Sequence, residues 1–333
     1  MRSMKRQELI SYIKKNNKLP QGVKDISGLD LEGMDLSGQD LSLINCENVD
    51  FRNSTLKGTI FFKANLKNAL LNGADIHEAD FTGADLTGAR LDNVIGREVG
   101  FGAAKLHNAT FFEADLHATT FTKSDLRNAD FRCADMTACR LREADMRGAD
   151  FTEATLQYAD LSLTKVARAR FDNADLKQSR LRSLVGYERA SWIGTDIRDI
   201  NFAGGYLLRR FIMDQNYLKE FKERSPLCNV LYWLWLITSD CGRSMFRWLL
   251  WTALITLFFA WLYTLTGIDY GRFPTPLSPL YFSIVTLTTL GYGDIVPKNM
   301  LGQIVAMLEV MTGYLMLGGL LSILSNKIAR RSE

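Results

Sequence analysis

Seven residues near the C-terminus combine types and spacing that could bind a cation stripped of its water: Thr288, Thr289, Leu290, Gly291, Tyr292, Gly293 and Asp294. Such a cation needs several rings of backbone carbonyl oxygens aimed at one axis, and four copies of a short loop can supply them. The alternate glycines permit this backbone, because glycine takes φ > 0 where a residue with a Cβ resists it. A glycine-rich turn on a soluble domain is the competing interpretation. The heptad therefore predicts a cation pathway lined by backbone oxygens.

The segments on either side of the heptad favour a membrane location. Residues 246–266 and residues 300–326 are each apolar for long enough to cross a hydrocarbon layer of roughly 30 Å. Between them, residues 279–288 form an apolar helix that is too short to span. A helix of this kind is tolerated at membrane depth where protein buries it. We therefore expect two spans with a re-entrant pore helix between them.

The heptad resembles the selectivity filter of potassium channels, and the order of elements resembles the two-transmembrane potassium channels of prokaryotes. The resemblance covers roughly residues 243–331. It implies a potassium-selective pore built by four copies of the chain, with K⁺ as the permeant ion. The filter would then be residues 289–294, namely Thr289, Leu290, Gly291, Tyr292, Gly293 and Asp294. In such a filter the Thr289 hydroxyl adds the innermost ring of oxygens, and Tyr292 braces the loop against the pore helix.

The same resemblance assigns roles to positions around the filter. Gly313 would be the gating hinge of the second span, and Tyr281 of the pore helix would brace Asp294. The cavity below the filter would be lined by four side chains: Thr288, Tyr314, Leu317 and Leu321.

Glu309 is a carboxyl group near the middle of the second span. Ionisable residues at membrane depth face a cavity or a partner, because a charge in hydrocarbon is costly. Two interpretations stay open. Glu309 could concentrate cations beneath the filter, or it could be a protonated structural group that is hydrogen-bonded behind the pore helix. The sequence slightly favours the second.

Basic residues predict the orientation of the spans. The segment between them carries only Arg272 and Lys298, whereas eight basic residues lie outside: Lys219, Lys222, Arg224, Arg243, Arg247, Lys327, Arg330 and Arg331. Because cytoplasmic flanks are rich in Lys and Arg, both termini should be cytoplasmic. The charged first 18 residues contain no apolar core typical of a cleaved signal peptide. We expect a multi-pass protein of the inner membrane.

The residues that precede the pore repeat with a period of five. From Leu31 to Leu181 every fifth position holds Leu, Phe, Ile, Met or Val, apart from Cys46 and Gly96. This period matches neither an amphipathic helix nor a strand. The residue two places earlier is usually small. Runs such as Ala84-Asp85-Leu86-Thr87-Gly88 resemble the pentapeptide-repeat family.

That family folds as a right-handed β-helix with a square cross-section and four repeats per coil. In twenty-residue steps the nine central phenylalanines fall on two opposite faces, Phe51, Phe111, Phe131, Phe151 and Phe171 on one and Phe61, Phe81, Phe101 and Phe121 on the other. Aromatic ladders through a stacked core explain this division. The predicted fold class is multidomain: a right-handed quadrilateral β-helix, followed by an all-α two-transmembrane pore domain with a re-entrant pore helix.

The predicted domain order has four parts. Residues 1–20 form a capping helix, 21–203 the β-helix, 204–242 a linker with interfacial amphipathic helices, and 243–333 the pore domain. Two irregularities interrupt the repeats. The small residues vanish over 94–99, where we expect a protruding loop, and the frame slips after residue 181.

The leading hypothesis is a tetrameric potassium-selective channel with a cytoplasmic repeat domain that regulates, docks or assembles it. An unknown cytoplasmic ligand or protein would bind the repeats. The alternatives are a membrane-tethered repeat protein of interaction type and a nonselective cation channel. Between Lys24 and Asp199 the charges are 28 acidic and 22 basic, a net of −6 that is too weak for DNA mimicry, so no nucleic acid partner is expected. The three His and five Cys show no metal-ligand spacing, and no nucleophile–base pair appears, so we expect neither cofactor nor enzyme activity.

Overall fold

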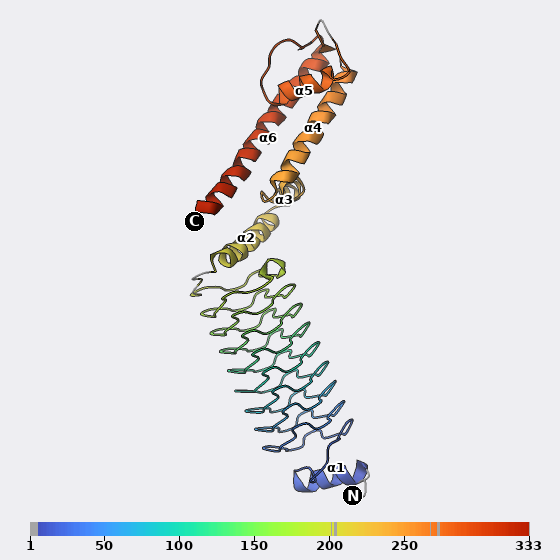
Figure 1. Cartoon of the computed structure of the whole chain (residues 1–333), viewed down its shortest axis with the longest axis vertical. Helices are drawn as coiled ribbons and strands as arrows, with labels where there is room; N and C mark the ends of the chain where they lie inside the picture. The colour runs from blue at the N-terminus through green and yellow to red at the C-terminus, as the bar shows by residue number, and fades with distance from the viewer. Residues whose placement is uncertain (1–5, 201, 203–204, 267, 272–273, 333) are drawn as a thin grey trace. The chain divides into compact units, whose positions relative to one another are not determined.

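A computed structural model describes residues 6–200, 202, 205–266, 268–271 and 274–332. Residues 1–5 of the predicted cap and Arg272 of the charge argument lie outside the described residues. The chain forms two compact units, Met1–Lys219 and Glu220–Glu333 (Figure 1).

The repeats form a four-sided β-helix in which every coil takes twenty residues. Parallel bridges join the residue before each central position to the residue twenty places later, as in Asp30 to Asp50 and Asp50 to Leu70. Backbone hydrogen bonds also run from coil to coil; the Phe51 N–H donates to the Leu70 carbonyl at 2.7 Å. The fold predicted from the period of five is confirmed, and the stacked coils are visible in Figure 1.

Each repeat builds one side of a coil from local preferences at four of its five positions. The central apolar residue and the small residue two places before it are buried. The intervening Asp or Asn accepts a hydrogen bond from the backbone N–H two places later, as Asp25 does from Ser27 at 2.8 Å. The last residue turns the corner with φ > 0, as in Asn48 and Gly73. Glycine and asparagine suit that position because they tolerate left-handed backbone.

Aromatic rings stack along two opposite faces of the core. Phe61 and Phe81 lie 4.8 Å apart between ring centroids, and Phe131 and Phe151 lie 5.0 Å apart, with nearly parallel planes. All nine central phenylalanines are fully buried. Trp192 extends one ladder, with its ring 4.3 Å from that of Phe171. The ladders predicted from the twenty-residue spacing are therefore confirmed.

The two irregularities have different outcomes. The loop expected over 94–99 is wrong, because Ile95 bridges to both Asp75 and Asp115 in the regular pattern. Gly96 keeps the coil regular: a Cβ there would lie 2.6 Å from Cγ1 of Ile76, which fills the space. The slip after residue 181 is real. Bridges then join residues 21 places apart, and the 3₁₀ helix η1 (Tyr187–Arg189) holds the inserted residue.

Helices close both ends of the coil stack. Helix α1 (Arg6–Asn16) buries Leu9 and Ile13 against the first coils, as a repeat array requires. Helix α2 (Tyr206–Glu223) buries Leu208 and Ile212 in the same core. Its Asn216 side chain accepts a hydrogen bond from the Gly194 N–H at 2.6 Å. The compact unit therefore extends to Lys219, beyond the boundary after residue 203 that the sequence indicates.

The second unit is helical, apart from one short strand pair. Two helices are long and apolar enough to cross a membrane by length and composition, Met245–Leu265 and Met300–Ser325. Ser225 caps the helix that begins at Pro226, where its hydroxyl accepts a hydrogen bond from the Cys228 N–H. Ser244 caps the helix that begins at Met245, where its hydroxyl accepts from the Arg247 N–H. The elements in order are α3 (Pro226–Ser239), α4 (Met245–Leu265), β1 (Ile268–Asp269), α5 (Ser278–Leu287), β2 (Val296–Pro297) and α6 (Met300–Ser332).

Candidate functional site

The heptad follows helix α5 directly and has an alternating backbone. Thr289, Gly291 and Gly293 have φ of 59°, 53° and 78°, whereas the residues between them do not have positive φ. Alternation of this kind aligns successive N–H groups on one side of the chain and successive carbonyl groups on the other. The sequence predicts positive φ at the two glycines. It gives no sign of it at Thr289, a β-branched residue that rarely adopts this conformation.

Backbone hydrogen bonds tie the start of the heptad to the end of α5. The Thr289 N–H donates to the Thr286 carbonyl, and the Leu290 N–H donates to the Val285 carbonyl, both at 3.0 Å. These bonds hold Thr289 in its strained conformation. The helix end beside them carries the partial negative charge of the helix dipole. The arrangement places carbonyl groups and a helix C-terminus together, which is an environment that attracts cations.

The outer end of the heptad is held by side chains. The Tyr281 hydroxyl donates to a carboxylate oxygen of Asp294 at 2.8 Å, the contact that the sequence predicts. Just beyond, β1 pairs antiparallel with β2, and Lys298 lies 3.1 Å from Asp269. The Lys298 hydrogen bond lowers the pKa of the Asp269 carboxyl below its ordinary range. The loop around the heptad is therefore anchored at both ends.

Glu309 lies in a buried network that joins three helices. Its side chain is fully buried. One carboxyl oxygen accepts a hydrogen bond from the Tyr263 hydroxyl of α4 at 2.5 Å, and the other lies 2.5 Å from the Ser283 hydroxyl of α5. The same Ser283 hydroxyl lies 2.8 Å from the Thr256 carbonyl. Glu309 therefore stands behind the pore helix, among Tyr263, Ser283 and Thr256, and is not among the residues that line the hollow described below.

Two glycines of α6 allow neighbouring elements to approach closely. A Cβ on Gly313 would lie 2.1 Å from the carbonyl oxygen of Leu287, the last residue of α5. A Cβ on Gly319 would lie 2.1 Å from the ring of Trp248, whose indole N–H donates to the Met316 carbonyl at 2.8 Å. Helix α6 continues without a break through both positions. Sequence reasoning missed these contacts, since they join residues far apart in the chain.

The predicted cavity residues are partly brought together. Thr288, Tyr314 and Leu317 line one hollow, together with Thr289 and Gly313 from the filter and hinge predictions. The remaining lining is apolar apart from Thr252, and comes from Leu249, Leu287, Met316 and Leu320. Leu321 is exposed and does not line this hollow.

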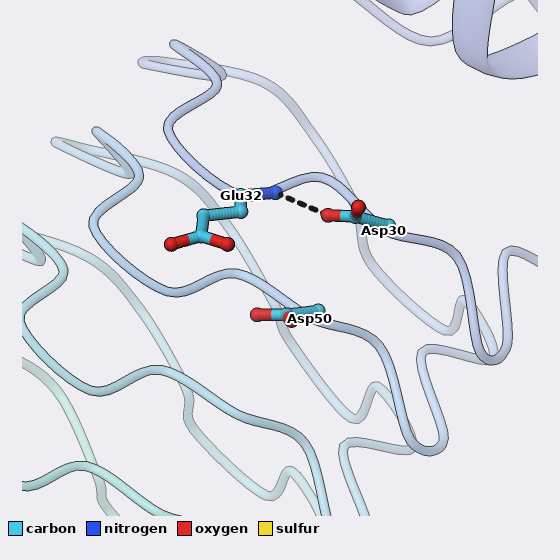
Figure 2. A group of neighbouring side chains, drawn as sticks. All are labelled: Asp30, Glu32 and Asp50. Atoms are coloured by element: carbon cyan, nitrogen blue, oxygen red, sulfur yellow. Dashed lines mark hydrogen bonds between the residues drawn. The ribbon is translucent and has the colours of Figure 1, made fainter.

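One cluster in the repeats brings three acidic side chains together. Oxygens of Asp30, Glu32 and Asp50 lie within 4.8 Å of one another, and Figure 2 shows the Glu32 N–H donating to Asp30. The guanidinium of Arg52 lies 2.6 Å from Asp50 and 3.3 Å from Glu32. The positive charge beside these carboxylates already balances part of their charge, which argues against a metal ion there.

Comparisons with known proteins match the two units separately. A family described as "Ion channel" matches residues 251–330, and the pentapeptide-repeat family matches eight copies within 30–95 and 109–182. A calcium-gated potassium channel of Thermoplasma volcanium is 37% identical over 62 residues, or 19% of this chain and 18% of the relative. The two-pore potassium channel 1 of Arabidopsis thaliana is 41% identical over 54 residues, or 16% and 15%. The chain thus spans less than a fifth of the length of either relative.

Solved structures overlap the repeats. HetL, a pentapeptide-repeat protein of the cyanobacterium Nostoc sp., is 23% identical, covers 60% of this chain and 96% of its own, and has a TM-score of 0.34. QnrB1, a plasmid-mediated fluoroquinolone resistance protein, is 21% identical, covers 56% of this chain and 94% of its own, and has a TM-score of 0.41.

Proposed function

We propose, for a chain that joins pentapeptide repeats to a potassium channel domain, that four copies form one potassium-selective pore in the inner membrane. The filter backbone is the observation that carries this proposal. Alternate φ signs at Thr289, Gly291 and Gly293 aim successive carbonyl groups to one side of the chain. One chain supplies only one side of each oxygen ring, so the rings need further copies around the axis.

Uncovered apolar side chains in the pore unit support the assembly. In one chain the Leu290 side chain is 59% exposed and that of Tyr292 is 67% exposed, although both belong to the filter. Tyr314 and Leu317 are exposed beside the hollow. Neighbouring copies of the chain and lipid are the partners that would cover such surfaces.

Within this proposal, the carbonyl groups of the filter replace the water of a K⁺ ion: Thr289, Leu290, Gly291, Tyr292 and Gly293, with Asp294 at the outer mouth. The Thr289 hydroxyl forms the innermost ring. Thr288, Tyr314, Leu317 and Leu321 line the cavity below. A bend of α6 at Gly313 gates the pore, and this bend separates Gly313 from the Leu287 carbonyl that it touches in the described state. K⁺ is the permeant ion, and no cofactor is required.

We further propose that Glu309 is a protonated structural group. The Ser283 hydroxyl has one hydrogen but two acceptors in reach, the Thr256 carbonyl and the Glu309 carboxyl. One hydrogen serves one of them well. A proton on Glu309 supplies the second bond and removes the cost of a buried charge.

The orientation in the proposal follows from the basic flanks, with both termini and the repeat domain in the cytoplasm. The repeat domain then regulates, docks or assembles the channel through a cytoplasmic ligand or protein. An enzyme role has no support in either matched family.

Bi-ionic reversal potentials test the proposal directly. Full-length protein in planar bilayers with K⁺ on one side and Na⁺ on the other should show a strong K⁺ preference. Gly291→Ala should abolish this preference, because alanine resists the left-handed backbone that the filter needs.

Gly38→Ala is the matched control. It places the same φ strain in the repeats, at φ 64° with open space around the Cβ, and should leave selectivity unchanged. A pore that conducts Na⁺ and K⁺ equally would replace the proposal with a nonselective channel. Reproducible absence of current from both proteins, with chains that stay monomeric, would favour a membrane-tethered repeat protein.

A further inference from the structure

The four faces of the repeat stack carry unlike charges. We number them in chain order by their central residues, in steps of twenty: face 1 from Leu31 to Phe171, face 2 from Leu36 to Leu176, face 3 from Leu41 to Leu181 and face 4 from Ile26 to Val166. The frame shift adds Trp192 to face 1 and Ile197 to face 2.

Faces 1 and 2 together carry 18 acidic and 8 basic residues, whereas faces 3 and 4, with the insertion at 185–189, carry 10 acidic and 14 basic. The stack therefore has an acidic half and a basic half, which the small net charge conceals.

The segregation is sharpest over residues 114–199. On face 2 this part holds five acidic and two basic residues: Asp115, Asp135, Asp175, Asp196, Asp199, Lys177 and Arg198. Face 3 holds five basic and two acidic residues: Lys123, Arg140, Arg142, Arg180, Arg182, Glu143 and Asp160. Arg140, Arg180 and Arg182 are exposed and have no ion pair among the residues that the structure describes.

Over residues 24–113 the same two faces both have a net negative charge. Face 2 has four acidic and two basic residues there, and face 3 has two acidic and one basic. Complementarity is therefore confined to the half of the stack that is nearer to the channel in sequence.

Exposed apolar side chains mark the same two faces. Within the described part of residues 24–200, seven large apolar residues are exposed, and six of them lie on faces 2 and 3: Ile95, Tyr158, Leu43, Ile60, Phe62 and Leu163. The seventh, Val185, bridges to Lys165 of face 4, and face 1 has none. Tyr158 and Leu163 lie in one coil at the two corners of face 3: Tyr158 turns the chain from face 2 to face 3, and Leu163 turns it from face 3 to face 4. They are 59% and 42% exposed.

We propose that the repeat domains of neighbouring chains pack side by side, with face 2 of one copy against face 3 of the next over residues 114–199. The inference rests on the proposed fourfold assembly. Four square rods that meet around one axis each touch two neighbours through two faces that share a corner. Faces 2 and 3 share a corner and have opposite charge, so one repeated heterologous contact closes the ring. Tyr158, at the shared corner, then lies at the axis in every copy, and Thr155 of one copy lies level with Asp160 of its neighbour.

In this contact the charges determine which faces meet more than how tightly they bind. Exposed ion pairs contribute little energy each, but complementary faces select the partner and the register. The exposed apolar side chain of Tyr158 lies at the axis, beside these charges. The first coils stay apart, because their facing charges repel, and their surfaces remain free for another partner.

Cross-linking of the full chain in lipid nanodiscs tests the contact. Cys133, Cys228 and Cys241 are replaced by Ser, while the buried Cys46 and Cys139 stay. Thr155→Cys and Asp160→Cys chains are then co-expressed, and a short bis-maleimide is added. We expect cross-linked dimers from the mixture and several-fold less from either variant alone, since each interface joins residue 155 to residue 160. Asp150→Cys with Lys165→Cys is the matched pair at the middle of faces 1 and 4.

Charge reversal adds a second readout. Arg140→Glu should lower the yield of the 155–160 dimer several-fold, and Asp135→Arg in the same chain should restore it. Raising ionic strength should lower the yield too. Native mass spectrometry of the same samples separates two failures. Chains that are not tetramers overturn the proposed function, whereas tetramers without the 155–160 product, or with the 150–165 product in its place, overturn this contact.

Discussion

The repeat unit and the pore unit bury their apolar side chains in different ways. In the repeats, nine phenylalanines are fully buried and each coil hydrogen-bonds to the next, so one chain completes its own core. The pore unit has a small buried cluster around Phe259, Tyr263, Phe282 and Ile295. Its filter and much of α6 stay exposed. The core of the repeats is therefore completed within one chain, whereas the pore unit exposes apolar side chains that neighbouring chains and lipid would cover in the proposed assembly.

The largest effect should come from Gly313→Ala in the pore unit. Its Cβ would meet the Leu287 carbonyl at 2.1 Å, which forces α6 away from the pore helix. Gly318→Ala is the control, because nothing lies within 4 Å of its Cβ. Alanine favours a helix by about 1 kcal/mol over glycine at both positions. We expect Gly313→Ala to lose K⁺ flux in liposomes and Gly318→Ala to keep it. Equal flux from the two variants would contradict the close packing.

A core truncation in the repeats should destabilise that unit and leave the filter alone. Phe131→Ala removes a fully buried ring from the ladder and should cost about 3–5 kcal/mol. Urea unfolding followed by circular dichroism measures this, and Lys57→Ala on the exposed surface should change stability by less than about 0.5 kcal/mol. Channels that assemble from Phe131→Ala chains should select K⁺ normally. Altered selectivity would show that the two units do not act independently.

Glu309 gives the smallest expected effect when its hydrogen bonds are preserved. Glu309→Gln keeps an acceptor for Tyr263 and a donor for Ser283, so conductance should stay near the original value between pH 5 and pH 8. Glu309→Ala removes the acceptor of the buried Tyr263 hydroxyl, at about 1–3 kcal/mol for an unsatisfied buried group, whereas Ser283 keeps the Thr256 carbonyl.

The thermal stability of the tetramer and single-channel conductance distinguish the two Glu309 variants. A large loss of conductance in Glu309→Gln would restore the role of a cavity charge.

Periodic features of this chain are visible in its sequence, and long-range contacts are not. The period of five gives the coils, and the spacing of Phe61 and Phe81 gives the ladders, because each rests on residues at fixed separations. Gly291 and Gly293 likewise indicate positive φ at their own positions. The close contact of Gly313 with the Leu287 carbonyl and the burial of Leu208 at the end of the repeats leave no pattern in the local sequence. Sequence cannot show them, since an ordinary helix tolerates either residue.

The wrong prediction of a loop at 94–99 also arises because the sequence does not show contacts between coils. Gly96 lacks the apolar side chain that the period of five requires, but Ile76 from the previous coil fills that space. Packing between coils corrects a local fault that the sequence alone presents as a loop.

A coil that closes every twenty residues also restricts how this protein can evolve in length. Gain or loss of twenty residues adds or removes one whole coil and keeps every later side chain on its original face. Gain or loss of five turns all later faces by a quarter, so that aromatic columns meet aliphatic ones and acidic sides meet basic sides. Viable descendants should therefore differ in length by multiples of twenty residues. The single extra residue near Tyr187 changes the spacing late in the repeat unit, where only two repeats and helix α2 follow it within that unit.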